Sequence, residues 1–163
     1  MGMGAGSSVW RTWPLIFPEI SVGMSVAASL DMGVGKIAGL RVLIVDDDPV
    51  CARLLRAVLE TEWCAVTIVT SLADAMQGVD GCRPEVVMVR LEVAHGAGLD
   101  LVKDLRAYTR LGRLALLGMT GNTTRYSECV ALEAGCDALL VLPLDTRGLA
   151  STIADAMAQR AAS

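Results

Sequence analysis

The most informative segment of the chain is Arg41-Val-Leu-Ile-Val-Asp-Asp-Asp-Pro49. After Arg41 it begins with a short apolar run, which is typical of a strand buried on both faces of a parallel sheet. Asp48 and Pro49 then indicate the start of a helix, because an aspartate caps free backbone amides and proline suits the first helical position. The segment therefore predicts a strand, an acidic turn and a helix in succession.

The same alternation of strand and helix continues along the rest of the chain. Short apolar runs predict five strands, at residues 41–45, 65–69, 86–89, 114–117 and 138–141. The stretches between them have the apolar spacing and the end signals of helices, such as Ser71 followed by Asp74 in a near capping box. Strands that alternate with helices predict an α/β fold, in which right-handed crossovers give a doubly wound five-stranded parallel sheet with helices on both faces.

Spacing and capping signals give finer predictions for two of the helices. The first helix carries apolar side chains four residues apart, on one face: Val50, Leu54 and Val58. The fourth helix is expected to begin at Asn122 or Thr123, either of which can cap it, and to end at Gly135.

A sheet of this kind binds its ligand beyond the carboxyl ends of the strands. Four segments of the chain fall there: Asp46-Asp47-Asp48, residues 90–98, Met119-Thr120-Gly121 and Leu142-Pro143. A functional site in this domain is therefore expected among these segments.

Composition excludes several classes of function. The 163 residues carry 14 Lys and Arg against 18 Asp and Glu, so the net charge of −4 lacks the basic excess that a nucleic-acid binder needs. Aromatic residues make up only 4% of the chain, and the single histidine, His95, cannot build a histidine-rich metal site. The five cysteines include no Cys-x-x-Cys pair, which indicates small buried hydrophobic residues in a reducing cytoplasm.

Residues 1–39 lack the alternating strand and helix pattern of the rest of the chain. They are interpreted as an extension ahead of a domain at 40–160. Their apolar stretch, residues 13–30, is interrupted by two prolines and a glutamate, so we expect neither a membrane span nor a signal peptide. Two interpretations of the extension stay open. It is either a disordered segment or upstream sequence read from too early a start codon, with a later methionine as the true initiator.

Several motifs stand at fixed positions relative to the predicted strands: Val-Asp-Asp-Asp-Pro after the first, then Gly98, Met119-Thr120-Gly121, Gly135-Cys-Asp-Ala138 and Leu142-Pro143. Together, over about Leu40 to Gln159, they resemble the receiver domain of two-component response regulators. The resemblance implies a flavodoxin-like sheet of strand order 2-1-3-4-5 and a role in phosphorelay signal transduction. It also implies a phospho-accepting aspartate after the third strand, a lysine after the fifth, and a Mg²⁺ ion held by acidic residues.

The residues that would carry this chemistry are replaced. The resemblance places the phospho-accepting aspartate at Arg90, the lysine at Leu142 and an aromatic switch residue at Leu139. An arginine forms no acyl phosphate, and its positive charge opposes Mg²⁺ binding beside Asp46 and Asp47. We therefore expect no phosphorylation at position 90, no bound metal and no cofactor.

Arg90 is instead expected to lie between Asp46 and Asp47 as an internal counter-ion, because an arginine stays charged and its planar fork suits carboxylates. Thr120 keeps its hydroxyl beside the pocket, without a phosphoryl group to bind. The degenerate pocket is thus predicted to hold no catalytic residue and to consist of five residues: Asp46, Asp47, Arg90, Thr120 and Leu142.

These expectations describe a pseudo-receiver, a single-domain, non-enzymatic and atypical response regulator in the cytoplasm. It is expected to bind a histidine kinase, a phosphotransfer protein or another regulator, and not nucleic acid or a membrane. The face made by the fourth helix, the fifth strand and the fifth helix is the candidate homodimer surface. Two alternatives stay open: phosphoryl acceptance on Glu92 or Asp100, and a small nucleotide-binding α/β domain, for which no glycine-rich turn follows the first strand.

Overall fold

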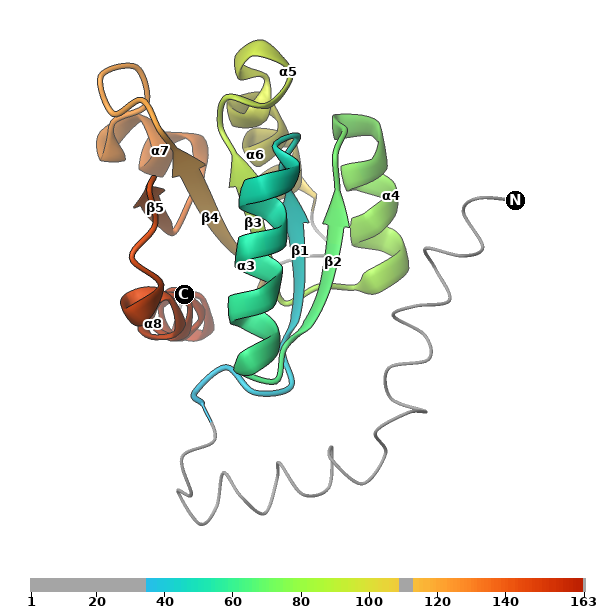
Figure 1. Ribbon diagram of the computed structural model, residues 1–163. Helices are drawn as coiled ribbons and strands as arrows, with labels where there is room; N and C mark the ends of the chain where they lie inside the picture. Colours follow the sequence, from blue (N-terminus) through green and yellow to red (C-terminus); the bar gives the residue numbers. More distant parts are fainter. Residues whose placement is uncertain (1–34, 109–112, 163) are drawn as a thin grey trace.

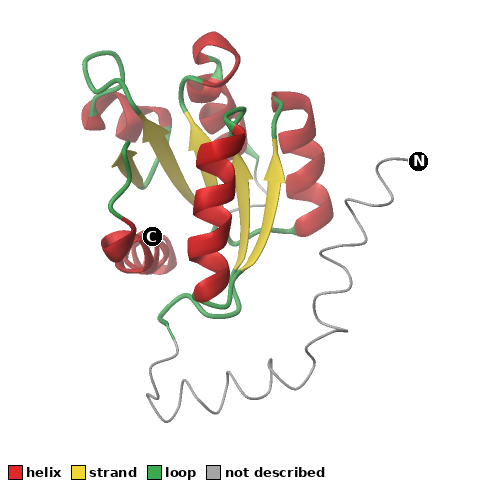
Figure 2. Cartoon of the chain, viewed as in Figure 1, coloured by secondary structure: helices red, strands yellow, loops and turns green. Residues whose placement is uncertain are grey.

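The computed structural model of the protein describes residues 35–108 and 113–162. In this part of the chain, strands and helices alternate, and the strands lie side by side between helices (Figures 1 and 2). Most of the predicted extension, residues 1–34, lies outside the described residues.

The described strands form one five-stranded parallel sheet, in the order β2-β1-β3-β4-β5. They are β1 (Arg41–Val45), β2 (Ala65–Val69), β3 (Val86–Arg90), β4 (Ala115–Thr120) and β5 (Ala138–Val141). The helices are α3 (Pro49–Thr61), α4 (Leu72–Cys82), α6 (Gly98–Ala107), α7 (Glu128–Ala134) and α8 (Leu149–Ala162), with the short turns α5 (Val93–Gly96) and η2 (Thr146–Gly148). The predicted fold class and strand order are confirmed.

Helices cover both faces of the sheet, and each face has its own apolar core. On one face, α3 and α8 pack through side chains such as Leu55, Leu59 and Ile153. On the other face, α4, α6 and α7 pack through side chains such as Val79 and Leu101. The strands between the two layers are largely buried, which explains why most of them read as continuous apolar runs.

The ends of the helices follow the sequence signals in three cases, one of which is the predicted end of α7 at Gly135, and differ in one. Asp48 caps α3 by accepting a hydrogen bond from the amide of Val50 at 3.0 Å, and Ser71 caps α4, so both predictions are confirmed. The predicted start of α7 at Asn122 or Thr123 is wrong, because Ser127 is the cap. Asn122 instead closes a turn before the helix, where its side chain accepts from the amide of Arg125 at 3.1 Å.

Most of the apolar stripe predicted for α3 faces away from the core, and only Val58 packs against it. Val50 and Leu54 are 75% and 52% exposed, and Val58 is only partly buried. The residues of α3 that enter the core are Ala52, Leu55 and Leu59. The helix carries two apolar stripes, and four-residue spacing alone does not tell which one faces the sheet.

The packed domain begins before residue 40. Ile37 is completely buried in the core beside α3 and α8, and its carbonyl accepts a hydrogen bond from the thiol of Cys64 at 3.3 Å. Gly39 donates its amide to the carbonyl of Trp63 at 2.9 Å. The domain therefore includes residues 35–39, which the alternating sequence pattern leaves to the extension.

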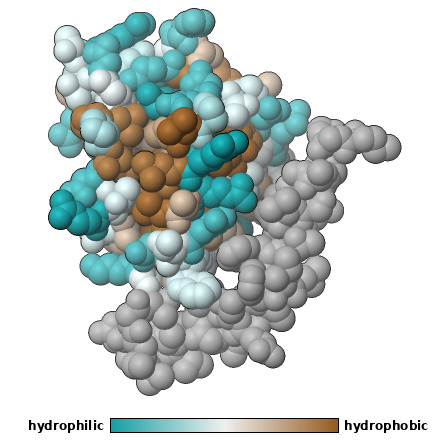
Figure 3. Space-filling view, in the orientation of Figure 1, coloured by the Kyte–Doolittle hydropathy of each residue, from teal (hydrophilic) through white to brown (hydrophobic). Residues whose placement is uncertain are grey.

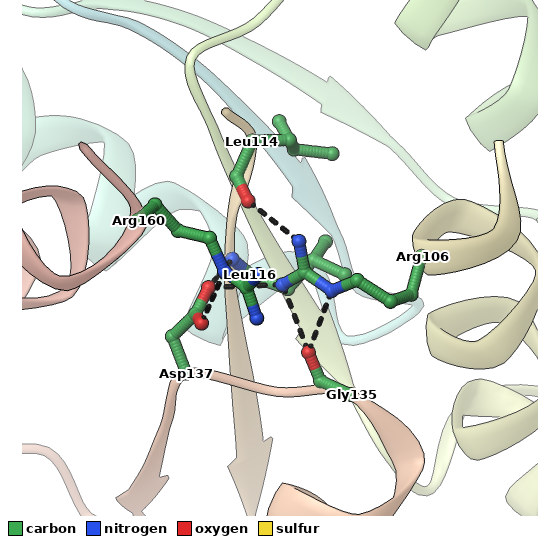
Figure 4. Close-up of polar contacts among 6 residues, drawn as sticks. All are labelled: Arg106, Leu114, Leu116, Gly135, Asp137 and Arg160. Atoms are coloured by element: carbon green, nitrogen blue, oxygen red, sulfur yellow. Dashed lines mark hydrogen bonds and ion pairs between the residues drawn. The ribbon is translucent and has the colours of Figure 1, made fainter. Parts of the chain in front are cut away.

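A buried carboxylate joins the two helix layers at the amino ends of β4 and β5 (Figure 4). Asp137 accepts hydrogen bonds from Arg160 of α8 at 2.6 Å, from Arg106 of α6 at 2.9 Å, and from the amide of Leu116 at 2.8 Å. Arg106 also donates to the carbonyl oxygen of Gly135. One aspartate thus fixes helices from opposite faces of the sheet to its strands.

Candidate functional site

The candidate site lies at the carboxyl ends of three neighbouring strands. Asp46 follows β1, Arg90 ends β3 and Thr120 ends β4, and parallel pairing brings these ends to the same edge of the sheet. Asp46 and Thr120 are both completely buried. Burial of polar groups at a strand edge is costly unless they are paired, so their contacts define the site.

Asp46 is held by its own turn and faces a cation. Its Oδ1 accepts a hydrogen bond from the amide of Asp48 at 2.9 Å. Its Oδ2 lies 3.5 Å from Nη1 of Arg90. No hydrogen bond reaches Oδ2 within the described residues, so the ion pair with Arg90 is what compensates this buried charge.

Arg90 bridges two carboxylates, but one of them is not the predicted partner. Its Nε lies 3.5 Å from Oε2 of Glu92, while its Nη1 faces Asp46. Asp47 is exposed, and within the described part of the chain it forms no ion pair with Arg90. The side chains of adjacent residues in extended chain diverge, so only Asp46 of the two points inward, and the expected contact with Asp47 is replaced by Glu92.

The sequence analysis considered Glu92 only as an alternative phosphoryl acceptor and did not expect its side chain to contact Arg90 and Thr120. Its Oε1 accepts hydrogen bonds from the hydroxyl of Thr120 and from the amide of Gly121, both at 2.7 Å. The Thr120 hydroxyl in turn accepts from the amide of Asn122 at 2.9 Å. Only the position of Glu92, two residues after an inward arginine, could have signalled this role.

A thiol stands beside the charged cluster. Cys51, in the first turn of α3, is partly buried. Burial, together with a hydrogen bond to the Asp46 carboxylate and the charge of that group, raises the pKa of Cys51 to about 11. The thiol is therefore protonated at neutral pH and adds no charge to the site.

The turn after β3 that contains Glu92 has unusual backbone conformations. Ala94 and His95 both have positive φ, at 49° and 61°, and Gly96 follows at 102°. His95 is exposed there. Gly98 then starts α6 directly against the end of β3, where a Cβ would lie 2.5 Å from the carbonyl oxygen of Arg90. A glycine at this position lets α6 approach the strand closely.

Comparison with known proteins places this arrangement in a family. Residues 42–154 match the family described as the response regulator receiver domain. The chain belongs to this family. None of the helices in the described part of this receiver domain is long and apolar enough to cross a membrane.

Two regulators are similar in sequence to this receiver domain. It is 33% identical over 116 residues to the transcriptional regulatory protein AruR of Pseudomonas aeruginosa, a match that covers 68% of this chain and 46% of that protein. It is 27% identical over 113 residues to the DNA-binding response regulator MtrA of Mycolicibacterium smegmatis, a match that covers 69% of this chain and 48% of that protein. The chain thus spans about half the length of these relatives.

Two solved structures share the fold of this receiver domain. A putative response regulator of Chloroflexus aurantiacus J-10-fl matches with a TM-score of 0.69 and 24% identity, over 74% of this chain and 98% of that one. A sensor protein of Polaromonas sp. JS666 matches with a TM-score of 0.68 and 28% identity, also over 74% and 98%.

Two further positions of the receiver pattern hold leucines. Leu142 follows β5, donates its amide to the carbonyl of Thr120 at 2.8 Å, and precedes Pro143 through a cis peptide bond. It therefore supplies a backbone contact and no cation. Leu139, within β5, is partly buried and packs against a core that contains the buried ring of Tyr126. It supplies packing and no aromatic ring.

Proposed function

We propose that this receiver domain acts in two-component signalling as a pseudo-receiver, without phosphorylation of its strand-end site. The observation that carries the proposal is the 3.5 Å ion pair between Arg90 and the completely buried carboxylate of Asp46. A buried carboxylate that is already neutralised by a residue of its own chain needs no metal ion to stabilise it.

The chemistry of the two replaced positions supports the proposal. An acyl phosphate forms on a carboxylate, whereas a guanidinium stays protonated in proteins and offers no free lone pair for attack on phosphorus. Leu142 adds no ammonium group that would pair with phosphoryl oxygens. Phosphoryl transfer to the end of β3 therefore lacks both its acceptor and its lysine.

The donors around Asp46 also do not suit Mg²⁺. This ion takes several oxygen ligands in near-octahedral geometry, whereas Oδ2 of Asp46 faces a cation and Asp47 is turned to the surface. Within residues 35–108 and 113–162, no group of three His, Cys, Asp or Glu side chains is placed to hold a metal ion. We infer that the domain needs no divalent cation.

The output of a pseudo-receiver has to pass through protein contacts. We propose a histidine kinase, a phosphotransfer protein or another regulator as partner, and a homodimer through the face formed by α7, β5 and α8. Leu132 on α7 and Val141 on β5 support this face, because they are large apolar side chains that are 46% and 49% exposed. Burial of these two side chains in a dimer would remove apolar surface from water, which favours association.

A second apolar surface lies between α3 and α8 (Figure 3). Val50 and Leu54 contribute the exposed stripe of α3, and Leu144, just after β5, is partly buried against the same core. We propose that this surface receives the kinase or phosphotransfer partner, which leaves the α7–β5–α8 face to self-association.

The alternatives from the sequence analysis have less support. Asp100 is exposed on α6 and has no contact with Thr120, whereas Glu92 does touch that hydroxyl. Phosphoryl acceptance on Glu92 is therefore the alternative that the geometry favours. A nucleotide-binding function has no support in the turn after β1, which is acidic and lacks glycine.

The experiment that tests the proposal is incubation of the full chain with acetyl phosphate and Mg²⁺, followed by intact-mass measurement. We expect no gain of a phosphoryl group under conditions that phosphorylate an ordinary receiver domain run in parallel. A phosphoryl gain that the Glu92→Gln variant loses would overturn the proposal in favour of acceptance on Glu92.

A further inference from the structure

Glu92 occupies a position in the site where a bound anion would be expected. Two backbone-anchored donors, the hydroxyl of Thr120 and the amide of Gly121, converge on its Oε1 at 2.7 Å each. Its Oε2 lies 3.5 Å from Nε of Arg90. Two hydrogen-bond donors from the end of β4 and one cation from the end of β3 therefore surround one carboxylate, which is the arrangement of a small oxyanion site.

We propose that Thr120, Gly121 and Arg90 form an oxyanion-binding cradle and that the carboxylate of Glu92 is its internal ligand. The proposal rests on the proposed function, since it takes the cradle of the unphosphorylated chain as already filled. The ligand class that the cradle accepts, once Glu92 is removed, is a small tetrahedral oxyanion such as inorganic phosphate.

The hydrogen bonds of Thr120 direct its hydroxyl proton toward the carboxylate of Glu92. The hydroxyl accepts from the amide of Asn122 at 2.9 Å, so its single hydrogen is free to be donated to Glu92. Thr120 is completely buried, so its hydroxyl is shielded from bulk solvent. The donor is therefore fixed in direction before any ligand arrives, which lowers the entropic cost of binding.

Arg90 faces two carboxylates, and this arrangement determines which of its atoms can bind an added anion. Its Nη1 faces Asp46, which remains a buried negative charge in the site and opposes a second anion. Its Nε faces Glu92 and makes no hydrogen bond within the described residues. Nε is thus the guanidinium donor that an added oxyanion would take over from Glu92.

The internal ligand has a structural consequence for signalling. Glu92 belongs to the turn between β3 and α6, whereas Thr120 and Gly121 end β4. The carboxylate therefore ties that turn to the neighbouring strand permanently. Because the ligand is part of the chain, its effective concentration is high, and free phosphate does not displace it. The cradle is therefore kept occupied without a phosphoryl group.

The test compares the thermal unfolding of full-length variants in sodium phosphate and in sodium chloride of equal ionic strength. The variants are wild type, Glu92→Ala, the double variant Glu92→Ala/Thr120→Val, and Asp155→Ala as a control that removes an exposed carboxylate on α8. We expect a phosphate-specific rise in Tm only for Glu92→Ala, of roughly 3–6 °C at about tenfold excess over its Kd. Wild type, the control and the double variant should show none.

A second measurement keeps the proposal testable if Glu92→Ala is poorly folded. The Gly121 amide proton, hydrogen-bonded to a carboxylate, should lie downfield in the NMR spectrum of wild type and move upfield in Glu92→Gln, because a neutral amide is a weaker acceptor. An unchanged Gly121 resonance, or a phosphate response of equal size in wild type and Glu92→Ala, would overturn the cradle. A phosphoryl gain by intact mass would instead overturn the proposed function, so the two failures are distinguishable.

Discussion

Arg90 and Asp46 form an ion pair of 3.5 Å between the ends of two adjacent strands, and the carboxylate of the pair is completely buried. Breaking a buried pair by removing one partner leaves an uncompensated charge, which is much more costly than the pair itself is favourable. The chain therefore depends on the arginine at this position.

Gly98 should be intolerant of any side chain. In Gly98→Ala the new Cβ would lie 2.5 Å from the carbonyl oxygen of Arg90 and 2.7 Å from Cα of Leu91, both backbone atoms. We expect a loss of about 1–3 kcal/mol in the free energy of unfolding, measured by urea denaturation. Gly148→Ala is the matched control, because nothing lies within 4 Å of its Cβ position, and it should be neutral or slightly stabilising. Equal stabilities of the two variants would contradict the close approach of α6.

Asp137 should be among the most sensitive positions of the domain. Asp137→Ala removes the acceptor shared by Arg106, Arg160 and the amide of Leu116. Because two arginines and an amide lose their partner together, we expect a loss of about 3–5 kcal/mol in the free energy of unfolding. Asp155→Ala, an exposed carboxylate of α8, serves as control and should cost little. A small effect at Asp137 would show that the two helix layers do not depend on this contact.

Stability should fall in alkaline solution because of buried thiols. Burial raises the pKa of Cys64 and of Cys136 from an ordinary 9.0 to about 12 in the folded state. The folded state then binds more protons than the unfolded state above pH 9, so stability is complete below pH 9 and declines as the pH rises toward 12. Urea denaturation at a series of pH values should show this decline, and it should be shallower in Cys64→Ala. Parallel pH curves for the variant and wild type would contradict the assignment.

Self-association should depend on the α7–β5–α8 face. We expect light scattering to show a dimer of wild type at high concentration and a monomer of the double variant Leu132→Ser/Val141→Ser. The control is Val50→Ser/Leu54→Ser on α3, which changes a more exposed apolar pair and should remain dimeric. A wild-type chain that stays monomeric, or a dimer that is lost only in the α3 control, would remove this face from the proposal.

The sequence predicts the scaffold better than the site because the scaffold depends on local signals. Apolar runs such as residues 41–45 and caps such as Asp48 act within a few residues, and the structure confirms both. The positions of the strand ends follow from the same local signals. Parallel strands therefore bring Asp46, Arg90 and Thr120 to one edge of the sheet. The side of α3 that faces the sheet depends on tertiary packing, and two apolar stripes give no local signal for it.

The partner of Arg90 could not be predicted from the sequence either, because it too depends on tertiary structure. Asp47 and Glu92 are both acidic and both lie near the predicted pocket, so charge alone does not distinguish them. Asp47 points outward because it is adjacent to the inward Asp46, whereas Glu92 lies in the turn after β3, in which Ala94 and His95 take up left-handed backbone conformations. Alanine gives no warning of such a conformation, because a positive φ is uncommon for residues other than glycine.

The most direct test of the account is the stability of Arg90→Ala with and without millimolar Mg²⁺. Arg56→Ala, which removes an exposed arginine from α3, is the control. Wild type and the control should not respond to Mg²⁺. Arg90→Ala should lose about 1–3 kcal/mol in the free energy of unfolding in metal-free buffer, because Asp46 and Glu92 are left without their cation. It should recover part of that loss with Mg²⁺, since a ligand of the folded state raises its stability. Equal melting temperatures for wild type and Arg90→Ala, in both buffers, would contradict the role of Arg90 as the built-in counter-ion.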